Sequence, residues 1–413
     1  MTLNDWLNSL KYEATPDFAQ CQSYLSATIK LLNELQATEQ DAQWHAEGNV
    51  AIHTDMVLSA LYRLLTTQAS HIKDNQRQAI ILAALLHDIA KPLCTKSRLI
   101  NEQVRIVSPH HEQVGRDNLV YPLMELCLEY ETVELILQLV GYHHIPKLLV
   151  IKNESFGQYL KLALNADCEL LYWLEYADMQ GRICADKTEQ LMLLDEFKMF
   201  CQEYQLWGNS HQEIFQNICQ PLEKKPSPYQ QHYLEHYAVD ELISEKILLA
   251  QEAQGRTHQH AQSYSEVYIL CGPSGSGKSS WIKEHVDQGW LIISLDAIRK
   301  TYNGHRQSQK NRGQVMQIAK DSFKQALAKK QNVVWDATNL RRDFRSQIIN
   351  TAKRYHALTT LVVFHLKKET ILKRNASRAQ HKQVANSVIE KQLTQFQWPD
   401  KTEAHRFITI TEP

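Results

Sequence analysis

The sequence predicts two fold classes in one chain: an all-α N-terminal half, followed by an α/β C-terminal domain with a doubly wound parallel sheet. Three observations predict this division. The 413 residues exceed what one hydrophobic core usually organises. From about residue 20 to 205, apolar residues recur at helical spacing and β-branched alternation is rare. From residue 265 onward, short apolar runs alternate with helical segments, as in a parallel sheet covered by helices.

Helical stripes in the N-terminal half are clearest at 78–90, 133–140 and 191–200. Prolines and a polar run then surround one further helical segment, which predicts a connector containing a helix. Buried strands are predicted at 267–271, 291–294, 333–336, 361–366 and 407–410. We therefore expect a helical domain over 1–220, the connector over 221–262 and the α/β domain over 263–413.

Composition narrows the possible functions. No run of about 18 apolar residues occurs, which argues against a membrane span. The chain does not start with a basic stretch followed by an apolar one, and its eight cysteines form no Cys-x-x-Cys pair, so we expect a reduced, cytoplasmic protein. The net charge of −1 gives no global signal for nucleic acid, although basic residues gather between 341 and 382.

Histidines and acids in the N-terminal half predict a metal centre. His53 and Asp178 stand in separate predicted helices, and the doublet His87-Asp88 lies near the end of an apolar one. A buried charged doublet is unfavourable unless it is paired or binds a metal. Imidazole and carboxylate donors suit Mn²⁺, Co²⁺ or Ni²⁺, which would activate water against a phosphoester. Two cations at helical spacing from these acids are candidates to hold the phosphoryl group: Lys91 and Arg182.

A phosphate-binding loop is predicted in the C-terminal domain. Gly272-Pro-Ser-Gly-Ser-Gly-Lys278-Ser279 satisfies the pattern G-x-x-x-x-G-K-[ST] between a predicted strand and a predicted helix. Lys278 should bridge the outer phosphates and Ser279 should bind magnesium, so we expect ATP or another nucleoside triphosphate with Mg²⁺. The residues assigned to the nucleotide are Gly272, Ser274, Gly275, Ser276, Gly277, Lys278, Ser279 and Ser280.

Polar residues after the next strand predict how the acceptor is held. Asp296 follows the strand 291–294, so its carboxylate can face the cleft and take a proton from an attacking hydroxyl. Arg299 lies three residues further on, on the same helical face, and can clamp an acceptor phosphate.

Two further segments complete the predicted kinase site. Thr338 and Asn339 follow the strand 333–336 and are assigned to the substrate, while the role of the neighbouring Asp336 stays open. Arg374 and Arg378 are four residues apart on a predicted helix, as expected of a lid that closes over the transferring phosphoryl group.

The order His53, His87-Asp88, Asp178 resembles the HD-domain phosphohydrolases over most of residues 20–205. The resemblance implies that a histidine of each later pair, His111 and His143, serves a second metal or contacts phosphate. Because adjacent helical residues point about 100° apart, we expect only one histidine of each pair to face the site.

Residues from about 265 to 413 resemble the 5′-hydroxyl polynucleotide kinases. The resemblance rests on the phosphate-binding loop, the segments Ser-Leu-Asp-Ala-Ile-Arg and Asp-Ala-Thr-Asn, and the two lid arginines. It implies that Asp296 is the general base, that Arg299 binds the acceptor's phosphate and that Arg374 or Arg378 contacts the donor.

Together the halves resemble the bacterial end-healing enzymes that join an HD domain to a polynucleotide kinase. The resemblance implies phosphorylation of a 5′-hydroxyl end of RNA or DNA, and removal of a 2′,3′-cyclic or terminal phosphate. No Lys-x-Asp-Gly ligase motif occurs, so sealing implies a separate RNA ligase as partner.

Other functions stay open at this point. A small-metabolite kinase fused to an HD nucleotide phosphohydrolase fits the same motifs. So does a nucleotide-sensing regulator whose HD half only binds, or an inactive HD domain kept as a helical interaction module. The near-neutral charge argues against tight binding of long nucleic acid, although a short single-stranded end needs few phosphate contacts.

Overall fold

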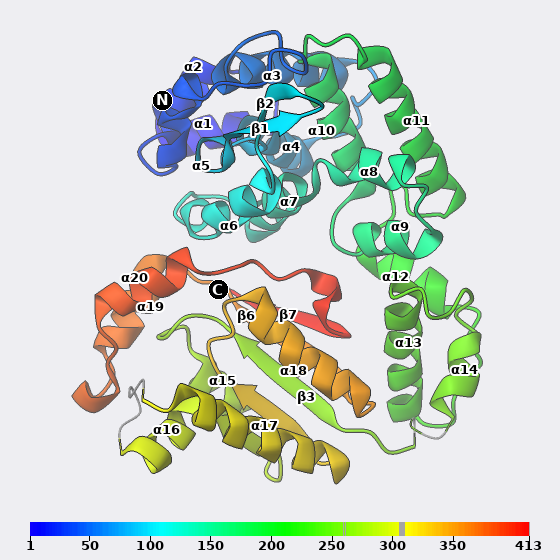
Figure 1. Ribbon diagram of the computed structural model, residues 1–413, viewed down its shortest axis with the longest axis vertical. Coiled ribbons are helices and arrows are strands. Elements are labelled where there is room, and N and C mark those ends of the chain that lie inside the picture. Colours follow the sequence, from blue (N-terminus) through cyan, green and yellow to red (C-terminus); the bar gives the residue numbers. More distant parts are fainter. Residues whose placement is uncertain (259, 261, 305–309, 413) are drawn as a thin grey trace. The chain divides into compact units, whose positions relative to one another are not determined.

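The computed structural model describes residues 1–413 apart from 259, 261, 305–309 and 413. The chain divides into two compact units, Met1–Ile214 and Phe215–Pro413 (Figure 1). Among the described residues, none of the helices combines the length and the apolar character that crossing a bilayer requires.

The first unit is helical, as predicted. Two short 3₁₀ segments, Lys30–Asn33 and Leu35–Ala37, precede the central helices. The α-helices are α1 (Leu3–Ser9), α2 (Phe18–Leu25), α3 (Val50–Thr66), α4 (Asp74–Leu86), α5 (Lys91–Cys94), α6 (His111–Met124), α7 (Tyr130–Tyr142), α8 (Ile145–Ile151), α9 (Phe156–Ala163), α10 (Cys168–Gln180), α11 (Lys187–Glu203) and, across the unit boundary, α12 (His211–Cys219).

Local capping and apolar burial explain the helices that matter for the site. The Asn49 side chain accepts a hydrogen bond from Ile52 N at 3.0 Å and so begins α3. The Asp167 side chain likewise accepts from two backbone amides at the start of α10. Helix α4 is buried along its length after Gln76, and it packs against α3, α7 and α10. A helix that is apolar on all sides is typical of a core element.

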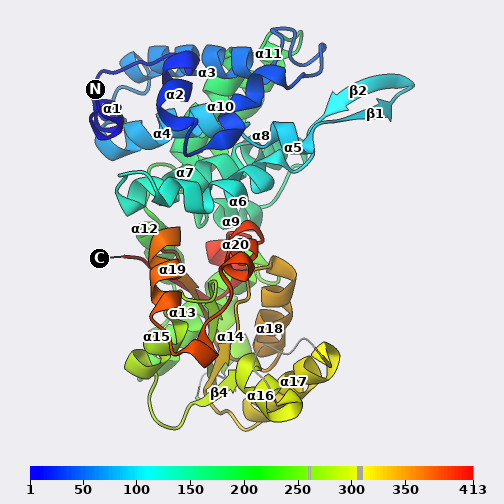
Figure 2. The ribbon, with the colours of Figure 1, turned by 90° about the vertical axis from the view of Figure 1, so that its left-hand side faces the viewer.

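A β-hairpin is the one departure from the predicted all-α half among the described residues. Strands β1 (Lys96–Ile100) and β2 (Gln103–Val107) pair antiparallel and extend away from the helices of their unit (Figure 2). Asn101 and Glu102 connect them with φ values of 49° and 63°. Two consecutive residues with positive φ form the tight turn that suits a hairpin, but neither residue is the glycine that usually signals it in sequence.

The second unit holds a five-stranded parallel sheet in the order β4-β5-β3-β6-β7. All five predicted strands are present, with bounds shifted by at most a few residues. They are β3 (Glu266–Cys271), β4 (Leu291–Ser294), β5 (Val333–Asp336), β6 (Leu358–Phe364) and β7 (Arg406–Ile410). Helices and 3₁₀ segments between and after them are α15 (Lys278–His285), α16 (Leu295–Asn303), α17 (Arg312–Ala328), α18 (Arg342–Arg354), α19 (Lys368–Ala376), Gln380–Lys382, α20 (Asn386–Thr394) and Lys401–Glu403.

The helix expected in the connector belongs to the second unit. Helix α13 (Pro228–Ile243) packs Tyr233 against Tyr264 and Leu358, beside the start of β6. Asp240 on the same helix pairs with Lys353 at 2.6 Å. A shorter helix, α14 (Glu252–Thr257), follows it. Residues 259 and 261 of the predicted polar boundary run lie outside the described residues.

Strand order places the predicted kinase residues at one edge of the sheet. β3 is central, and its carboxyl end runs into the phosphate-binding loop. The carboxyl ends of β4 and β5 are followed by Asp296 and by Thr338 and Asn339. In open parallel sheets, ligands bind in the crevice at this edge, next to the strand where the chain changes direction across the sheet.

Candidate metal centre and nucleotide site

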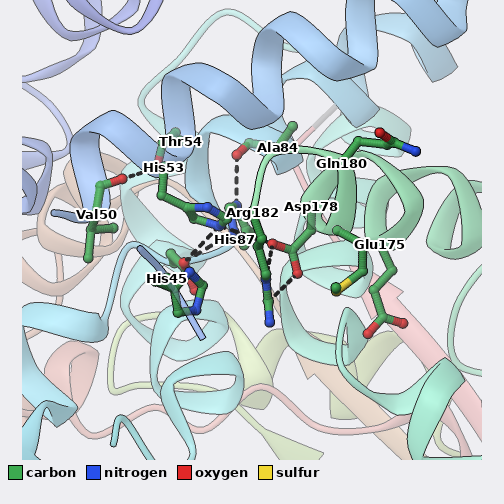
Figure 3. Close-up of polar contacts among 12 residues, drawn as sticks. His45, Val50, His53, Thr54, Ala84, His87, Glu175, Asp178, Gln180 and Arg182 are labelled. Atoms are coloured by element: carbon green, nitrogen blue, oxygen red, sulfur yellow. Dashed lines mark hydrogen bonds and ion pairs between the residues drawn. The ribbon is translucent and has the colours of Figure 1, made fainter. Parts of the chain in front are cut away.

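Three helices of the first unit bring the predicted metal ligands together. His53 comes from α3, His87 and Asp88 follow the end of α4, and Asp178 comes from the last turn of α10. His53 Nε2 lies 3.0 Å from Asp178 Oδ1, and His87 Nε2 lies 3.2 Å from Asp88 Oδ2. Figure 3 shows the side chains of His53, His87 and Asp178 converging.

Contacts behind each imidazole decide which nitrogen faces the centre. Nδ1 of His87 lies 2.8 Å from Ala84 O, and Nδ1 of His143 lies 2.8 Å from Val140 O. A carbonyl oxygen can only accept, so both Nδ1 atoms carry a proton, and in the neutral form of each ring the lone pair lies on Nε2. His111 is fixed in the same way by Ser108 O at 2.7 Å.

The donor set fits a divalent cation. Among the described residues, Nε2 of His87, His111 and His143 is buried without a hydrogen-bond partner. Lone pairs facing carboxylate oxygens at about 3 Å repel one another unless a proton or a metal lies between them. His53, His87 and Asp178 offer ligand atoms that all lie within 4.8 Å of one another, a separation that one ion can span.

Electrostatics keep these groups in the forms that bind metal. Burial by itself would raise the pKa of Asp88, but the charges of His87 and Lys91 outweigh it and hold that pKa well below its usual range. Burial, reinforced by His87 and His111, holds the pKa of His143 well below its ordinary value. The centre therefore offers an ionised carboxylate and a neutral imidazole at neutral pH.

Lys91 and Arg182, the cations predicted to bind the phosphoryl group, each form an ion pair with a carboxylate of the predicted metal site. Lys91 Nζ lies 2.6 Å from Asp88 Oδ2 and also donates to Gln40 Oε1 at 2.6 Å. Arg182 donates from Nε to Asp178 Oδ1 at 3.0 Å and from a second nitrogen to Asp178 Oδ2. Lys91 is almost fully buried. Each cation is thus placed within reach of a group bound at the centre, while it orients the carboxylate beside it.

Three histidines form a second group next to the first. The ligand atoms of His111, His143 and His144 lie within 4.8 Å of one another, and His111 Nε2 is 3.0 Å from Asp88 Oδ1. His110 caps α6 and is exposed. The expectation that only one histidine of each pair faces the site is wrong for His143 and His144. Helix α7 ends at Tyr142, so the chain turns between the two residues instead of continuing as a helix.

The sequence interpretation missed Glu47 and His45. Glu47 Oε1 accepts from Nδ1 of His53 at 2.9 Å and from Nδ1 of His45 at 2.8 Å, and its other oxygen accepts from Ile183 N at 2.9 Å. Burial would raise the pKa of Glu47, but these hydrogen bonds hold it below its ordinary value. A carboxylate behind a ligand histidine fixes its tautomer and makes it a stronger donor. A turn at Gly48 brings Glu47 to His53, and no helical spacing signals it.

The phosphate-binding loop of the second unit closes against helix α19. A Cβ atom on Gly275, where φ is +93°, would lie 2.7 Å from Ile371 O, so only glycine fits there. Gly272 N donates to Thr338 O at 2.9 Å, which ties the loop to the segment after β5. Ser276 is buried, while Ser279 and Ser280 are exposed at the start of α15. The amides at this helix start are placed to face phosphate oxygens.

Lys278 points back into its own loop. Its Nζ donates to Gly272 O at 2.8 Å and to Pro273 O at 2.7 Å. Burial lowers the pKa of Lys278 to about 8, and the charge of Asp336 opposes that shift while the charge of Arg378 adds to it. The ammonium group is therefore held at the loop. When a nucleotide binds, it can donate to phosphate oxygens in place of these two carbonyl oxygens.

The lid arginines reach the loop from two different backbone segments. Arg374 lies in α19 and donates from Nη1 to Ser276 O at 3.2 Å. The helix ends at Ala376, so Arg378 follows it instead of continuing the same helical face. Its charge nonetheless acts on Lys278, which places both arginines near the donor side of the loop.

Asp296 and Arg299 pair with each other. Arg299 Nη1 lies 2.6 Å from Asp296 Oδ1 at the start of α16. The Asp296 side chain is 62% exposed, and its charge acts on Lys278. The carboxylate is thus accessible from solvent and electrostatically coupled to the phosphate-binding lysine.

Asn339 takes part in the fold itself. It is buried with a φ of 47°, and its Nδ2 donates to Leu270 O at 2.7 Å. The carbonyl of Asn339 accepts from Arg345, a fully buried arginine that also pairs with Glu403. The Asn339 amide therefore stabilises the end of β3. Of the pair Thr338 and Asn339, only Thr338 has a side chain that is partly exposed.

Two family models match the chain. One describes the HD domain and covers residues 50–171, and the other describes an AAA domain and covers residues 267–399. The first range contains His53, His87 and Asp88, and the second contains the phosphate-binding loop. The chain joins an HD domain to a P-loop kinase-like domain. An HD domain implies a divalent metal and a P-loop kinase-like domain implies a nucleotide with Mg²⁺, and the histidine groups fit the former.

Relatives of this HD–kinase chain include gluconokinases. It is 26% identical over 158 residues to a probable gluconokinase from Schizosaccharomyces pombe (strain 972 / ATCC 24843), covering 34% of this chain and 78% of the relative. A crystal structure of a gluconokinase from Sinorhizobium meliloti 1021 matches 37% of this chain and 86% of its own, at 22% identity and a TM-score of 0.28.

Proposed function

We propose that this protein is a bifunctional enzyme that heals nucleic-acid ends. The HD domain hydrolyses a 2′,3′-cyclic or terminal phosphate, and the kinase-like domain transfers the γ-phosphate of a nucleoside triphosphate to a 5′-hydroxyl of RNA or DNA. The observation that carries the proposal is the presence in one chain of a metal donor set and a P-loop site whose lysine is under the charge of an exposed carboxylate. A separate RNA ligase would then seal the healed ends.

The residues of the HD domain set up hydrolysis by fixing donors and charges. His53, His87, Asp88 and Asp178 would hold one ion, and Asp88 with the histidine group of His111 would hold a second. When bound, a divalent ion such as Mn²⁺, Co²⁺ or Ni²⁺ lowers the pKa of a ligated water and neutralises charge on the phosphoester. In the neutral tautomer that these carbonyl oxygens select, Nε2 of His87, His111 and His143 would carry the lone pair that binds the ion.

Lys91 and Arg182 would stabilise the phosphoryl group. Each has hydrogen-bonding capacity beyond the carboxylate that it orients, because an ammonium has three donors and a guanidinium has five. A phosphate oxygen bound at the centre would replace Gln40 as the second partner of Lys91.

The kinase-like domain would act mainly by positioning charges. Asp296 would take the proton of the attacking hydroxyl once Arg299 leaves it for an acceptor phosphate. Lys278 would bridge the outer phosphates and Ser279 would bind the nucleotide's magnesium. Arg374 and Arg378 would contact the donor phosphates from the lid.

Exposure at Asp296 supports a polymeric acceptor. Because 62% of its side chain lies in solvent, the end of a nucleic-acid strand can approach this carboxylate. The site does not have to enclose the whole acceptor. Arg299, next to it, suits the phosphate that follows a 5′-terminal nucleoside.

A second candidate is a small-metabolite kinase, and the sequence similarity to a probable gluconokinase favours it. In that case the kinase-like domain would phosphorylate a small polyol or sugar acid, and the HD domain would hydrolyse a nucleotide. A third candidate, a nucleotide sensor, would bind without turnover at either site.

Acceptor competition tests these candidates. The full chain is incubated with γ-labelled ATP and Mg²⁺ in the presence of a 5′-hydroxyl RNA, a 5′-hydroxyl DNA or gluconate. We expect label on an oligonucleotide end and none on gluconate. Label on gluconate alone would establish the second candidate, and nucleotide binding without transfer to any acceptor would favour the sensor.

A matching assay tests the HD domain. An oligoribonucleotide ending in a 2′,3′-cyclic phosphate is incubated with the protein and Mn²⁺, and the ends are resolved by electrophoresis. We expect conversion to an opened or dephosphorylated end that stops on addition of a chelator. An unchanged end with every divalent metal tried would remove the nucleic-acid assignment of the HD domain.

A further inference from the structure

Trp44 is held at the surface of the first unit. All eight tryptophans are described, and it is the only one in the exposed class, with 40% of its surface in solvent. An indole left in solvent forgoes the burial that usually stabilises it, so its position calls for an explanation.

Neighbours of Trp44 in the chain contact groups of the metal centre. The next residue, His45, has its ring 4.8 Å from the ring of the ligand His53. Four residues before Trp44, Gln40 accepts a hydrogen bond from Lys91, the cation beside Asp88. Trp44 therefore lies in the chain between Gln40 and His45, which contact groups of the metal centre.

The indole is braced on one face. The guanidinium carbon of Arg105, in strand β2, lies 4.1 Å from the centroid of the Trp44 ring. Asp41 fixes that guanidinium through hydrogen bonds of 2.7 and 2.5 Å, and it also accepts from Ile106 N at 3.1 Å. A cation stacked on one face of an aromatic ring attracts the ring and holds it in place.

A fixed indole suits one class of ligand next to a phosphoester centre. Nucleobases have a π-face whatever their identity, and stacking on an aromatic side chain binds them without reading their sequence. A nucleobase is separated from a 2′,3′-cyclic phosphate only by the ribose ring. A ring that Arg105 holds next to His45 can therefore stack on the base while the centre holds the phosphate.

We propose that Trp44, braced by Arg105, is the stacking site for the nucleobase of the nucleotide whose phosphoester the HD domain hydrolyses. The inference rests on the proposed function of that domain and adds a base-binding subsite to it. With this subsite, the HD domain would bind nucleotides with little preference among the four bases.

Kinetics with and without a base test the subsite. The full chain with Mn²⁺ is assayed on adenosine 2′,3′-cyclic phosphate and on methyl riboside 2′,3′-cyclic phosphate, which has no base. In the wild type, KM for the nucleoside ester should be about tenfold lower. Trp44→Ala should bring the ratio of the two KM values close to one, with kcat for the nucleoside ester changed less than about twofold, and Trp44→Phe should restore most of the ratio.

A matched control separates stacking from general effects of an exposed aromatic. Tyr12, which is 67% exposed in the same unit, is replaced by alanine and should leave the KM ratio as in the wild type. A ratio that stays unchanged in Trp44→Ala overturns the proposal, whether both KM values rise together or neither moves. Equal KM values for the two esters in the wild type overturn it as well.

A binding measurement tests the base-binding subsite even if the wild type hydrolyses neither ester. Calorimetry then compares adenosine 3′-phosphate with ribose 3-phosphate in the presence of Mn²⁺. The nucleotide should bind about tenfold more tightly, and Trp44→Ala should abolish that advantage. Such a result would retain the subsite and reject the proposed hydrolysis, whereas equal affinities in the wild type would reject the subsite.

Discussion

His87, His111 and His143 are prepared as ligands by backbone carbonyl oxygens three residues earlier. Each carbonyl accepts the Nδ1 proton, so each Nε2 is left to face Asp88 or its neighbours. His53 reaches the same state through Glu47 instead. The metal centre is thus pre-organised by hydrogen bonds that need no metal to form.

Replacing Glu47 tests this preparation of His53. Glu47→Gln keeps an acceptor but removes the charge, and Glu47→Ala removes both, so we expect Mn²⁺ affinity to fall by about tenfold and about 100-fold, respectively. Metal titration of the full chain measures both values. Glu39→Gln, an exposed carboxylate in the same unit, should leave the affinity unchanged. Unchanged Mn²⁺ binding in Glu47→Ala would show that the carboxylate does not support the ligand.

Lys278 gives the nucleotide site a pH dependence. Its pKa of about 8 lies below the ordinary lysine value, so the free site loses this charge as pH rises through 8. Triphosphate binds the protonated form, which raises the lysine pKa again. We therefore expect ATP binding at pH 9 to take up close to one proton and binding at pH 7 to take up little, with affinity falling by up to about tenfold per pH unit above 8.

Calorimetry in buffers of different ionisation enthalpy measures the proton uptake. Lys278→Arg, which stays charged over this range, should show affinity without uptake. The same uptake in Lys278→Arg would assign the proton to another group.

At the scale of elements, the metal centre depends on how closely α10 approaches α3. Gly181 follows α10 between Asp178 and Arg182, and a Cβ atom there would lie 2.7 Å from Val57 Cγ2 and 2.8 Å from Val57 N. Because the second of these contacts is to backbone, a side chain rotation cannot relieve it. The absence of a side chain at one residue therefore sets the distance between two ligand-bearing helices.

Gly181→Ala should push α10 away from α3. We expect a loss of about 1–3 kcal/mol in the free energy of unfolding and weaker Mn²⁺ binding, since Asp178 moves with its helix. Thermal unfolding with and without Mn²⁺ measures both effects. Gly255→Ala is the control, because nothing lies within 4 Å of its Cβ position. Wild-type Mn²⁺ affinity in Gly181→Ala would mean that the helices can separate without disturbing the centre.

At the scale of the whole molecule, each compact unit holds one complete set of chemical groups. All the metal-site residues lie within Met1–Ile214, and all the nucleotide-site residues lie within Phe215–Pro413. Neither set of residues needs a side chain from the other unit. Point changes should therefore separate the two activities.

We expect Asp88→Ala to lower phosphoester hydrolysis by about 100-fold or more and to spare phosphoryl transfer, and Lys278→Ala to do the reverse. Both activities are measured on the full chain of each variant, with circular dichroism to verify folding. Loss of both activities in a folded single variant would show that the two sites depend on each other.

Much of the fold and of the two candidate sites was predictable because it depends on local sequence patterns. The five strands follow from short apolar runs, and the phosphate-binding loop follows from a spacing of glycines, lysine and serine whose conformation is local. The hairpin at 96–107 was missed because its turn residues, Asn101 and Glu102, are not glycine. Asn339 was assigned to substrate because it follows a strand end. Its buried hydrogen bond to Leu270 O joins segments 69 residues apart, which a local pattern does not reveal.

The sequence by itself determined the two fold classes, the residue types of both sites and the order in which the candidate ligands occur. These depend on periodicity and spacing, which act over a few residues. Tertiary structure alone decided that Glu47 supports His53, that His144 joins His111 and His143, and that Arg105 stacks on Trp44. Such contacts form only after helices distant in sequence have packed, and no local pattern encodes the distance between them.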